Sequence, residues 1–423
     1  MRRLSTLAGC CLLACFPLQI ARRLLNHVKE QKTQTFDSSR CKQLLVDVSV
    51  IYCIDAGTGI QRVVRALLNQ LLNNPPHGYD VRPVYASRAH GYRYASSDPG
   101  IEFLTKASYK VNEDVTVAAG DIFLGLDMCA HLLPKHRSQL HHWKLMDVEI
   151  HIIVYDLLPV LHPHWFRANT TRHFKRWLKT ITLYGDNLIC ISNTVRADLE
   201  FWMSRFYDTA QNRASLCVIQ LGADVSSSVP SKGIQPNSKQ FLLNLKLQPT
   251  ALMVGTVEPR KGYNEVVEAF EILWHSGYQA NLVIVGRSGW KTERLQEKIR
   301  NHKELGKRLF WLSEVSDELL EELYRTCVGL IAASFGEGYG LPIIEAAHYA
   351  KPVLARDIPV FREIAGPGVS FFATDDKSHL PSVIKHWLTA SHDLSQCMSK
   401  KNARTWRLSA QELLECMGIC GGN

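Results

Sequence analysis

The feature that most constrains the fold of this chain is the alternation of short apolar runs with helical patterns in its second half. Each run is mostly apolar at successive positions, so both faces of the strand that it predicts are buried, as in parallel sheets covered by helices on both sides. The predicted strands are 251–257, 281–286, 309–315, 328–334, 351–355 and 369–373. The pattern predicts a Rossmann-like domain over residues 240–390.

The first half repeats this pattern with more interruptions. The predicted strands are 42–51, 80–86, 121–127, 149–157, 187–192 and 217–222, and the predicted helices are 57–72, 137–144, 164–183 and 194–206. A stretch rich in Ser, Pro and Gly at 226–240 predicts a linker. We therefore predict an α/β protein with two Rossmann-like, doubly wound parallel-sheet domains that face a cleft, at 37–230 and 231–395, followed by a C-terminal helix at 396–423.

Residues 1–36 form a separate basic arm with an apolar stretch at 4–20. Residues 1–42 carry eight Lys or Arg against two acids, which is most of the net charge of +9, so a nucleic-acid-binding face is not predicted in the rest of the chain. The stretch is short for a membrane span and Pro17 interrupts it, so a signal peptide, a lipoprotein-like sequence, an interfacial anchor and a mis-assigned start stay open. We expect peripheral attachment of a cytoplasmic protein to the anionic inner face of the cytoplasmic membrane.

The twelve cysteines form no CxxC pair and no Cys/His cluster with zinc spacing. We therefore predict buried, reduced thiols in a cytosolic protein. His162, His164 and His173 lie close together in the sequence, and both a metal site and a structural loop are open for them.

The stretch SFGEGYGLPIIEA at 334–346 places two carboxylates, Glu337 and Glu345, around a glycine-rich loop between a predicted strand and a predicted helix. Pro342 suits the first turn of that helix, and the free N–H groups at a helix start suit a phosphate. Carboxylates accept hydrogen bonds from hydroxyl groups. Together these features predict a site for a nucleotide sugar, whereas a glycine turn with two solvated glutamates is the structural alternative.

Two further motifs fit the same ligand. Gly255 ends a predicted strand, and Arg260 and Lys261 stand just before the next helix, where two cations would neutralise a departing diphosphate. In the first half, Gly57 and Gly59 open a helix and offer backbone N–H groups, although the full GxGxxG fingerprint is absent. Solvated turns are the structural alternative for both motifs.

The motifs occur in a characteristic order: VYDLLPVLHPHWF (154–166), ICISNTVRADL (189–199), VIQLGAD (218–224), GTVEPRKG (255–262) and SFGEGYGLPIIEA (334–346). In this order and spacing the chain resembles the retaining GT-B glycosyltransferases of family four, also called group 1, and particularly their bacterial mannosyltransferase-like members. The resemblance covers residues 42–415.

The resemblance implies a role for each matching position. Glu337 would bind hydroxyls of the transferred sugar, Lys261 and Arg260 would hold the diphosphate, and Asp156 would lie near the reacting carbon. The other implied donor-binding residues are Glu345, which would bind the ribose, and Gly336, Gly338, Tyr339, Gly340, Leu341, Gly255 and Thr256. The implied acceptor and diphosphate loop comprises Gly57, Thr58, Gly59 and Tyr155. Thr256 and Tyr155 depart from the family, which usually has arginine and histidine there.

The predicted activity is therefore transfer of a hexose, mannose from GDP-mannose, to a lipid-linked or polysaccharide acceptor in lipopolysaccharide or exopolysaccharide biosynthesis. The resemblance implies retention of configuration, no protein nucleophile, no cofactor and no metal. A nucleotide-sugar epimerase or hydrolase of the same fold and an inactive binding subunit of a polysaccharide assembly complex stay open. An NAD-dependent oxidoreductase is disfavoured because GTVEPRKG lacks the phosphate fingerprint. The sequence does not define the donor base, the acceptor, the linkage or the oligomeric state.

Overall fold

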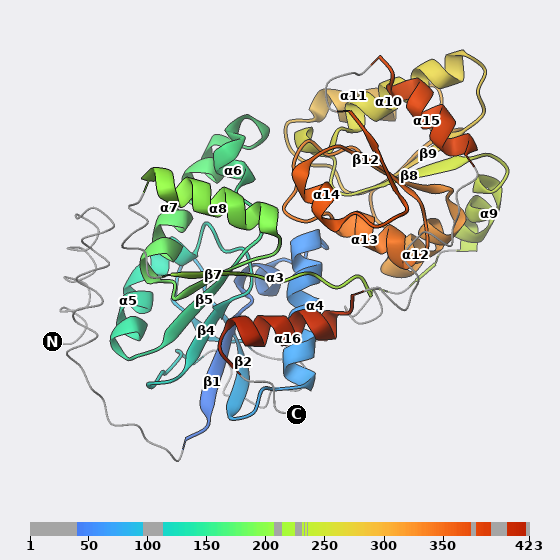
Figure 1. Ribbon diagram of the computed structural model, residues 1–423. Helices are drawn as coiled ribbons and strands as arrows, with labels where there is room; N and C mark the ends of the chain where they lie inside the picture. Colours follow the sequence, from blue (N-terminus) through green and yellow to red (C-terminus); the bar gives the residue numbers. More distant parts are fainter. Residues whose placement is uncertain are drawn as a thin grey trace. The chain divides into compact units, whose positions relative to one another are not determined.

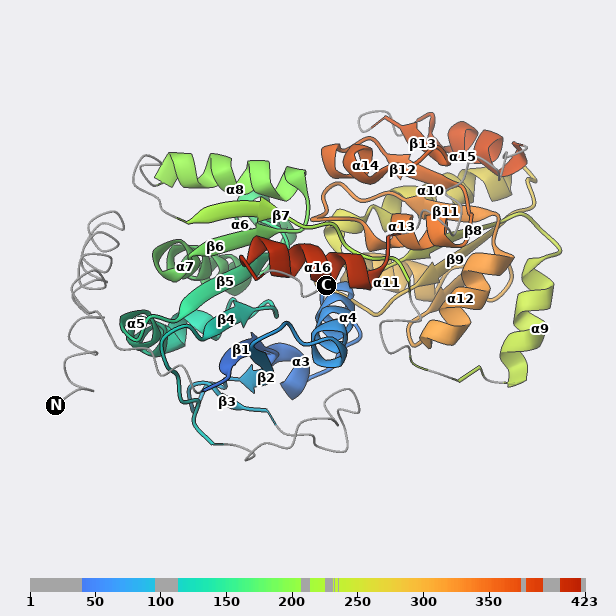
Figure 2. The same cartoon turned by 60° about the horizontal axis from the view of Figure 1, so that its bottom comes forward.

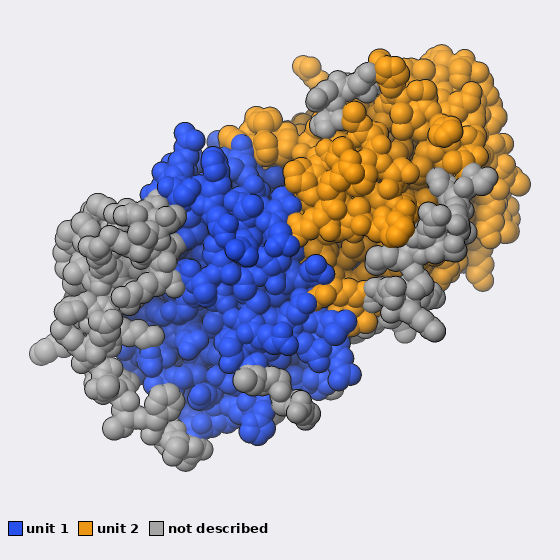
Figure 3. Space-filling view, viewed as in Figure 1, with its two compact units in different colours: residues 1–161, 168–220, 407–423 blue, residues 162–167, 221–406 orange. Residues whose placement is uncertain are grey.

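The computed structural model describes residues 40–95, 113–206, 214–224, 231, 233–234, 236–373, 378–390 and 404–419. The N-terminal arm at 1–36, with its predicted membrane attachment, lies outside the described residues. The chain divides into two compact units, coloured separately in Figure 3. Unit 1 comprises Met1–Leu161, Ala168–Gln220 and Arg407–Asn423, and unit 2 comprises His162–Arg167 and Leu221–Trp406.

Unit 1 is built on a seven-stranded sheet with the order β3-β2-β1-β4-β5-β6-β7 (Figure 1). Its strands are β1 (Lys42–Asp47), β2 (Tyr79–Tyr85), β3 (Arg93–Tyr94), β4 (Ile122–Gly125), β5 (Glu149–Val154), β6 (Asn187–Cys190) and β7 (Ser215–Val218). Six strands are parallel, as predicted, but the edge strand β3 is antiparallel to β2 and was not predicted. A strand of two residues carries no readable alternation of apolar and polar residues.

The helices of unit 1 lie on both faces of its sheet. They are α3 (Ser49–Cys53), α4 (Gly59–Asn73), η2 (Leu133–His136), α5 (Arg137–Leu145), α6 (Leu158–Leu161), α7 (Ala168–Tyr184), α8 (Asn193–Phe206) and α16, whose bounds are Trp406–Cys416. The chain moves one way across the sheet from β1 to β2 and the other way from β4 to β7. Because parallel crossovers are right-handed, α5, α7 and α8 share one face and α4 covers the other (Figure 2).

The predicted strand at 42–51 ends four residues early, at Asp47, and α3 begins at Ser49. The cause is capping by two aspartates. The Asp127 carboxylate accepts hydrogen bonds from the backbone N–H groups of Val50 and Ile51, both at 2.8 Å. The Asp47 carboxylate accepts one from the N–H of Ser49 at 2.9 Å. These bonds satisfy the free donors of a helix start inside an apolar run.

The prediction that all cysteines are reduced is wrong for one pair. Cys217 and Cys416 form a disulfide across 199 positions of the sequence. The bond joins β7 to the end of α16, where the Gln220 N–H also donates to the Glu412 carboxylate at 3.1 Å. The C-terminal helix is therefore fastened to the edge of the sheet of unit 1. Among the other described cysteines, Cys129, Cys190 and Cys327 are buried free thiols, and Cys41 and Cys53 are exposed.

Unit 2 is built on a six-stranded, fully parallel sheet with the order β10-β9-β8-β11-β12-β13, the order of a Rossmann fold. Its strands are β8 (Thr250–Val254), β9 (Asn281–Val285), β10 (Leu309–Leu312), β11 (Gly329–Ala332), β12 (Val353–Arg356) and β13 (Val369–Phe372). All six strands predicted for this half are confirmed.

The helices of unit 2 are η3 (Pro163–Trp165), α9 (Pro236–Leu245), η6 (Pro259–Lys261), α10 (Tyr263–His275), α11 (Glu293–Arg300), α12 (Asp317–Thr326), α13 (Leu341–His348), α14 (Pro359–Ile364) and α15 (Leu380–Thr389). α9 begins inside the segment predicted as a linker. Ser316 caps α12, because its hydroxyl accepts from the Leu319 N–H at 3.1 Å.

The core of unit 2 consists of two apolar layers, one on each face of the sheet. Successive strand residues point to opposite faces, so Met253 and Ile284 join one layer while Leu252 and Val283 join the other. This arrangement explains why these strands read as continuous apolar runs. No helix in the described part of the chain has the length and apolar character needed to cross a bilayer.

Candidate functional site

The candidate site lies where the strand order of unit 2 reverses. β8 pairs with β9 on one side and with β11 on the other. The chain therefore leaves β8 and β11 at the same edge of the sheet, and from there it continues to one side after β8 and to the other side after β11. The loop after β8 leads through η6 to α10, and the loop after β11 leads to α13. In open parallel sheets this edge is the place where ligands bind. The predicted motifs GTVEPRKG and SFGEGYG therefore meet at one point of the fold.

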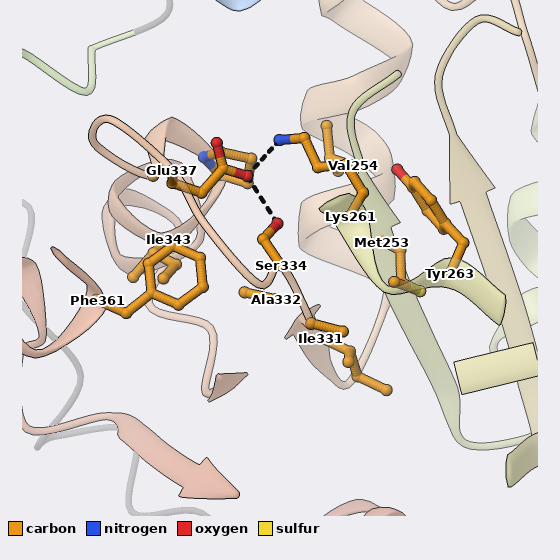
Figure 4. Close-up of a pocket in the computed structure, with 13 residues that line it drawn as sticks. Met253, Val254, Lys261, Tyr263, Ile331, Ala332, Ser334, Glu337, Ile343 and Phe361 are labelled. Carbon is orange, nitrogen blue, oxygen red and sulfur yellow. Dashed lines mark hydrogen bonds and ion pairs between the residues drawn. The ribbon is translucent and has the colours of Figure 1, made fainter. Parts of the chain in front are cut away.

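Glu337 is the centre of the site. Its carboxylate forms ion pairs with the Arg260 guanidinium and the Lys261 ammonium, both at 2.5 Å. The Ser334 hydroxyl donates to the same carboxylate at 2.7 Å, and Figure 4 shows Ser334 and Lys261 pointing at it from two sides. Arg260 also donates to Glu258 at 3.0 Å. The structure thus brings together three of the four residues predicted as catalytic.

The electrostatics of the site favour a charged Glu337. Burial alone would raise the pKa of this carboxyl group, because its side chain is only 11% exposed. The charges of Arg260 and Lys261, with the hydrogen bonds from Lys261 and Ser334, outweigh burial and lower the pKa to about 2. Glu337 is therefore an anionic acceptor at neutral pH.

Backbone geometry fixes the two loops against each other. Gly262 has a φ of 68° and precedes α10 directly, and a Cβ at this position would collide with the carbonyl oxygen of Ala333. The Phe335 N–H donates to the Arg260 carbonyl at 2.7 Å. Only glycine combines the left-handed conformation with this close approach. Lys261 and Glu337 consequently stay within hydrogen-bonding distance.

Lys261 lies over Gly255, the glycine that ends β8. A Cβ on Gly255 would lie 3.3 Å from the Lys261 ammonium, and Gly255 has a φ of 137°. The buried Tyr263 hydroxyl donates to the Gly255 carbonyl at 2.5 Å and fixes that turn. Thr256, which stands where the family usually has arginine, follows directly.

The site opens into a pocket of unit 2 (Figure 4). Its polar lining comes from Lys261, Ser334 and Glu337. The remaining lining residues are Met253, Val254, Tyr263, Ile331, Ala332, Ala333, Gly340, Pro342, Ile343 and Phe361. The pocket therefore offers one cation, one carboxylate and the Ser334 hydroxyl on a mostly apolar wall, while the Tyr263 hydroxyl is bound to the Gly255 carbonyl.

The other predicted donor-binding residues lie in the same loop with different surroundings. Glu345 on α13 is buried and accepts a hydrogen bond from the Tyr324 hydroxyl at 2.8 Å, and it does not line the pocket. Gly336 offers its carbonyl to Arg260 at 3.0 Å. Gly340 has a φ of 116°, precedes Leu341 at the start of α13 and lines the pocket.

Gly338 and Tyr339 complete the predicted loop. The Tyr339 hydroxyl accepts from the Leu221 N–H at 3.1 Å. Gly338 precedes it in the turn between β11 and α13. Their proposed contacts with a donor stay predictions.

The predicted acceptor-side residues belong to unit 1 and follow β1 and β5. Thr58 caps α4: its hydroxyl accepts from the Gln61 N–H at 3.3 Å, between Gly57, with a φ of 62°, and Gly59. The Asp156 carboxylate accepts from the Leu158 N–H at 3.0 Å. Tyr155 is buried and donates to the Leu126 carbonyl at 2.7 Å, so its hydroxyl already has a protein acceptor. The functional roles of these residues stay predictions.

Sequence reasoning missed two groups that shape these sites. In unit 2, Arg356 at the end of β12 is buried under the loop of Ala333–Glu337 and pairs with the buried Glu265. In unit 1, the buried Asp47 ends β1, and the buried Asp127 lies two residues after β4. An aspartate or arginine at the end of an apolar strand was the available signal, but such residues are common at strand ends that face solvent.

Asp127 gives the folded chain a measurable pH dependence. Burial raises the pKa of Asp127 to about 7, and the charge of Asp47 adds to this, against hydrogen bonds from the backbone of Ile51 and Val50. A folded-state pKa above the unfolded value of about 3.9 means that the folded state binds the proton more tightly. Its contribution to the free energy of unfolding is therefore present below pH 4 and disappears as the pH rises to about 7.

We predict that Asp127→Asn flattens the pH dependence of unfolding between about pH 5 and pH 8 by up to about 3 kcal/mol. Urea denaturation at both pH values measures it. Glu297→Gln, a change at an exposed position of α11, serves as the control and should leave the slope unchanged. An equal slope in Asp127→Asn and the parent chain would contradict the assignment.

Comparison with solved structures defines the class of this fold. Sucrose-phosphate synthase from Thermosynechococcus elongatus superposes with a TM-score of 0.56 at 18% identity, covering 90% of this chain and 95% of that one. Anabaena Alr3699/HepE in complex with UDP and glucose superposes with a TM-score of 0.60 at 13% identity, covering 90% and 100%. These likenesses show the fold alone. The chain has the GT-B fold of glycosyltransferases, as predicted.

Sequence comparison then gives the family. Residues 235–406 match the family described as glycosyl transferases group 1. The serotype-specific mannosyltransferase WbdA of Escherichia coli is 38% identical over 381 residues, which are 89% of this chain and 46% of WbdA. The O-antigen chain mannosyltransferase RfbU of Salmonella typhimurium is 28% identical over 60% of this chain and 62% of its own length.

These matches identify residues 235–406 as a group 1 glycosyltransferase domain, in a chain that is similar to bacterial mannosyltransferases of GT-B fold. The predicted resemblance is therefore confirmed. The chain spans about half the length of the WbdA proteins that it matches.

Proposed function

We propose that this protein is a retaining, metal-independent hexosyltransferase that moves mannose from GDP-mannose to a lipid-linked or polysaccharide acceptor in the biosynthesis of a cell-surface glycan. The observation that carries the proposal is the cluster of Glu337, Lys261 and Arg260 beside a pocket, at the edge of the sheet where β8 and β11 diverge. The names of the relatives, mannosyltransferases of O-antigen chains among them, support the choice of sugar and pathway class.

The cluster has the chemistry that a sugar diphosphate requires. Two cations can be shared with a diphosphate, and they stabilise the negative charge that grows on it as the glycosidic bond breaks. When a diphosphate takes over Lys261 and Arg260, the Glu337 carboxylate loses its two cationic partners. It then accepts hydrogen bonds from sugar hydroxyls instead. The same two side chains thereby couple arrival of the diphosphate to orientation of the sugar.

The remaining roles follow the family resemblance. We assign Glu345 to the ribose, Asp156 to the neighbourhood of the reacting carbon, and the loop of Gly57, Thr58 and Gly59 to the acceptor and diphosphate. We place the protein in the cytoplasm, at the inner face of the cytoplasmic membrane, on the strength of its basic N-terminal arm.

A transfer assay tests the proposal. The purified chain is incubated with GDP-mannose and a mannose-terminated oligosaccharide, and the product is analysed for a new α-linked residue by NMR. Transfer with retention supports the proposal. Release of free mannose without acceptor would instead indicate a hydrolase, and donor binding without any turnover would indicate the inactive binding subunit. Thermal-shift screening with GDP-mannose, UDP-glucose and dTDP-rhamnose identifies the donor, because a ligand that binds the folded state raises Tm.

Removing one cation should weaken donor binding. Lys261→Ala deletes the ammonium group that lies 2.5 Å from Glu337 and lines the pocket. A hydrogen bond to a charged group contributes about 1.5–3 kcal/mol, so we expect the Kd for GDP-mannose to rise roughly 10- to 100-fold. Isothermal titration calorimetry measures it, with Lys307→Ala as a control outside the pocket. An unchanged Kd would remove Lys261 from the donor site.

A further inference from the structure

Helix α7 of unit 1 carries a straight stripe of exposed cations. Arg172, Lys175, Arg176 and Lys179 are all exposed, and their spacing of three, four and seven residues places them on one side of the helix. The opposite side of α7 is buried through Phe174, Trp177, Leu178 and Ile181. The stripe is therefore held on a helix that is packed against its sheet.

The side chains of these four residues form no hydrogen bond or ion pair within the described part of the chain. Their spacing would allow each to pair with an acidic residue one turn away, but α7 contains none. On the neighbouring α8, Arg196 pairs with Glu200 one turn later at 2.8 Å. Like charges at these spacings destabilise a helix. The sequence of α7 therefore retains a repulsion that a single acidic residue would relieve.

The surface around the stripe continues the same charge. α7 packs on η2 and α5, which expose Lys135 and Arg137. The two segments that build this surface, 128–146 and 168–185, contain no Asp or Glu. Burial and then the nearby Arg88, His173 and Lys135 lower the pKa of His131, which lies between these elements. We name the exposed set of Arg172, Lys175, Arg176, Lys179, Lys135 and Arg137 the basic face.

Charge and shape decide which occupant fits the basic face. The N-terminal arm carries the same sign of charge, and so does a second copy of the chain, with its net +9. A stripe from Arg172 to Lys179 extends over about 10 Å, which suits an array of separate anions rather than one phosphate. The Phe, Trp and Tyr side chains of α7 (Phe174, Trp177 and Tyr184) are all buried and cannot stack on bases, as binding of single-stranded nucleic acids requires.

We propose that the basic face docks the protein on an anionic phospholipid surface. Each cation near such a surface adds to the attraction, and the attraction falls when salt screens it. This docking surface lies outside the candidate site of unit 2 and does not depend on the proposed function. Docking through the basic face would bring unit 1 to the lipid. Asp156, which is predicted to lie near the reacting carbon, belongs to the same unit.

Co-sedimentation of the full chain with vesicles tests the proposal. The vesicles contain either phosphatidylcholine alone or phosphatidylcholine with about 30 mol% phosphatidylglycerol, at about 0.1 M and about 0.5 M salt. The test variant is R172Q/K175Q/R176Q/K179Q. The matched control, K239Q/K246Q/R287Q/R294Q, removes four exposed cations of unit 2 and the same amount of charge.

We expect the parent chain and the control to bind anionic vesicles at low salt, and the test variant to bind at least about tenfold more weakly. Because the four side chains are exposed and repel one another, Tm should not fall in the test variant, and the thermal shift with GDP-mannose should not change. Equal binding of the test variant and the parent chain overturns the proposal and assigns attachment to another segment. Binding to neutral vesicles at the same strength, no vesicle binding at all, or tighter binding to duplex DNA than to vesicles also overturns it.

Discussion

Replacing Glu337 by Gln should lower kcat/KM for mannose transfer about 100- to 1,000-fold, because preorganised polar groups at a reacting centre contribute this much in enzymes. The carboxylate accepts from Lys261, Arg260 and Ser334, and its pKa of about 2 keeps it anionic. A glutamine amide is neutral, has one acceptor oxygen and adds a donor, so it cannot hold both cations before the diphosphate binds and is a weaker acceptor for a sugar hydroxyl afterwards.

Initial rates with GDP-mannose measure the effect, and circular dichroism with Tm shows whether the variant is folded. Glu304→Gln is the matched control, because it removes an ion-paired carboxylate of unit 2, bound to Arg308 at 2.8 Å, that does not line the pocket. The control should keep full activity. Full activity in Glu337→Gln would show that this carboxylate is not needed for the reaction, and it would contradict the central assignment of the proposed function.

The sequence predicted this cluster because its parts lie at the ends of recognisable elements. Gly255 and Glu337 follow two continuous apolar strands, and in a parallel sheet the carboxyl ends of neighbouring strands meet at one edge. The same two strands, β8 and β11, also supply apolar residues of the pocket wall. Glu345 was predicted by its place in the same motif, yet its carboxylate is buried against Tyr324, a contact set by packing of α12 on α13 rather than by the motif.

Interactions between distant parts of the sequence explain what the sequence did not predict. The apolar run at 42–51 bends into α3 because Asp127, almost eighty positions later, supplies the cap. The disulfide joins Cys217 and Cys416 across 199 positions, and no spacing rule connects two such cysteines. The basic face was hidden because the charge outside residues 1–42 is nearly balanced, and its signal is the absence of acids from 128–146 and 168–185.

Arg356→Met should lower the free energy of unfolding by about 3–5 kcal/mol, the usual effect of breaking a buried ion pair by removing one partner. Arg356 is only 1% exposed and Glu265 only 6%, so the remaining carboxylate would stay buried without this partner. The Arg356 guanidinium also donates to the Ala333 carbonyl at 2.8 Å and lies 3.9 Å from the ring centroid of Phe335.

Urea denaturation of three variants separates the buried pair from a general effect of losing arginine. Arg362→Met is the matched control, because Arg362 also pairs with a carboxylate, that of Asp357 at 2.7 Å, and also lies over a phenylalanine ring, that of Phe371. Both Arg362 and Asp357 are exposed. Exposed pairs contribute about 0–1 kcal/mol, so the control should unfold almost as the parent chain does. The double variant R356M/E265Q should recover part of the loss, because it leaves no buried charge unpaired.

The same substitution should reach the candidate site, because Ala333 and Phe335 lie on either side of Ser334, which donates to Glu337. Once Arg356 no longer fixes this loop, the carboxylate of Glu337 loses its alignment, and kcat should fall more than the affinity for GDP-mannose. In R356M/E265Q the stability returns in part, but the contacts to Ala333 and Phe335 do not, so kcat should stay low. Recovery of kcat together with stability would show that Arg356 acts on the fold as a whole and not on the position of Glu337.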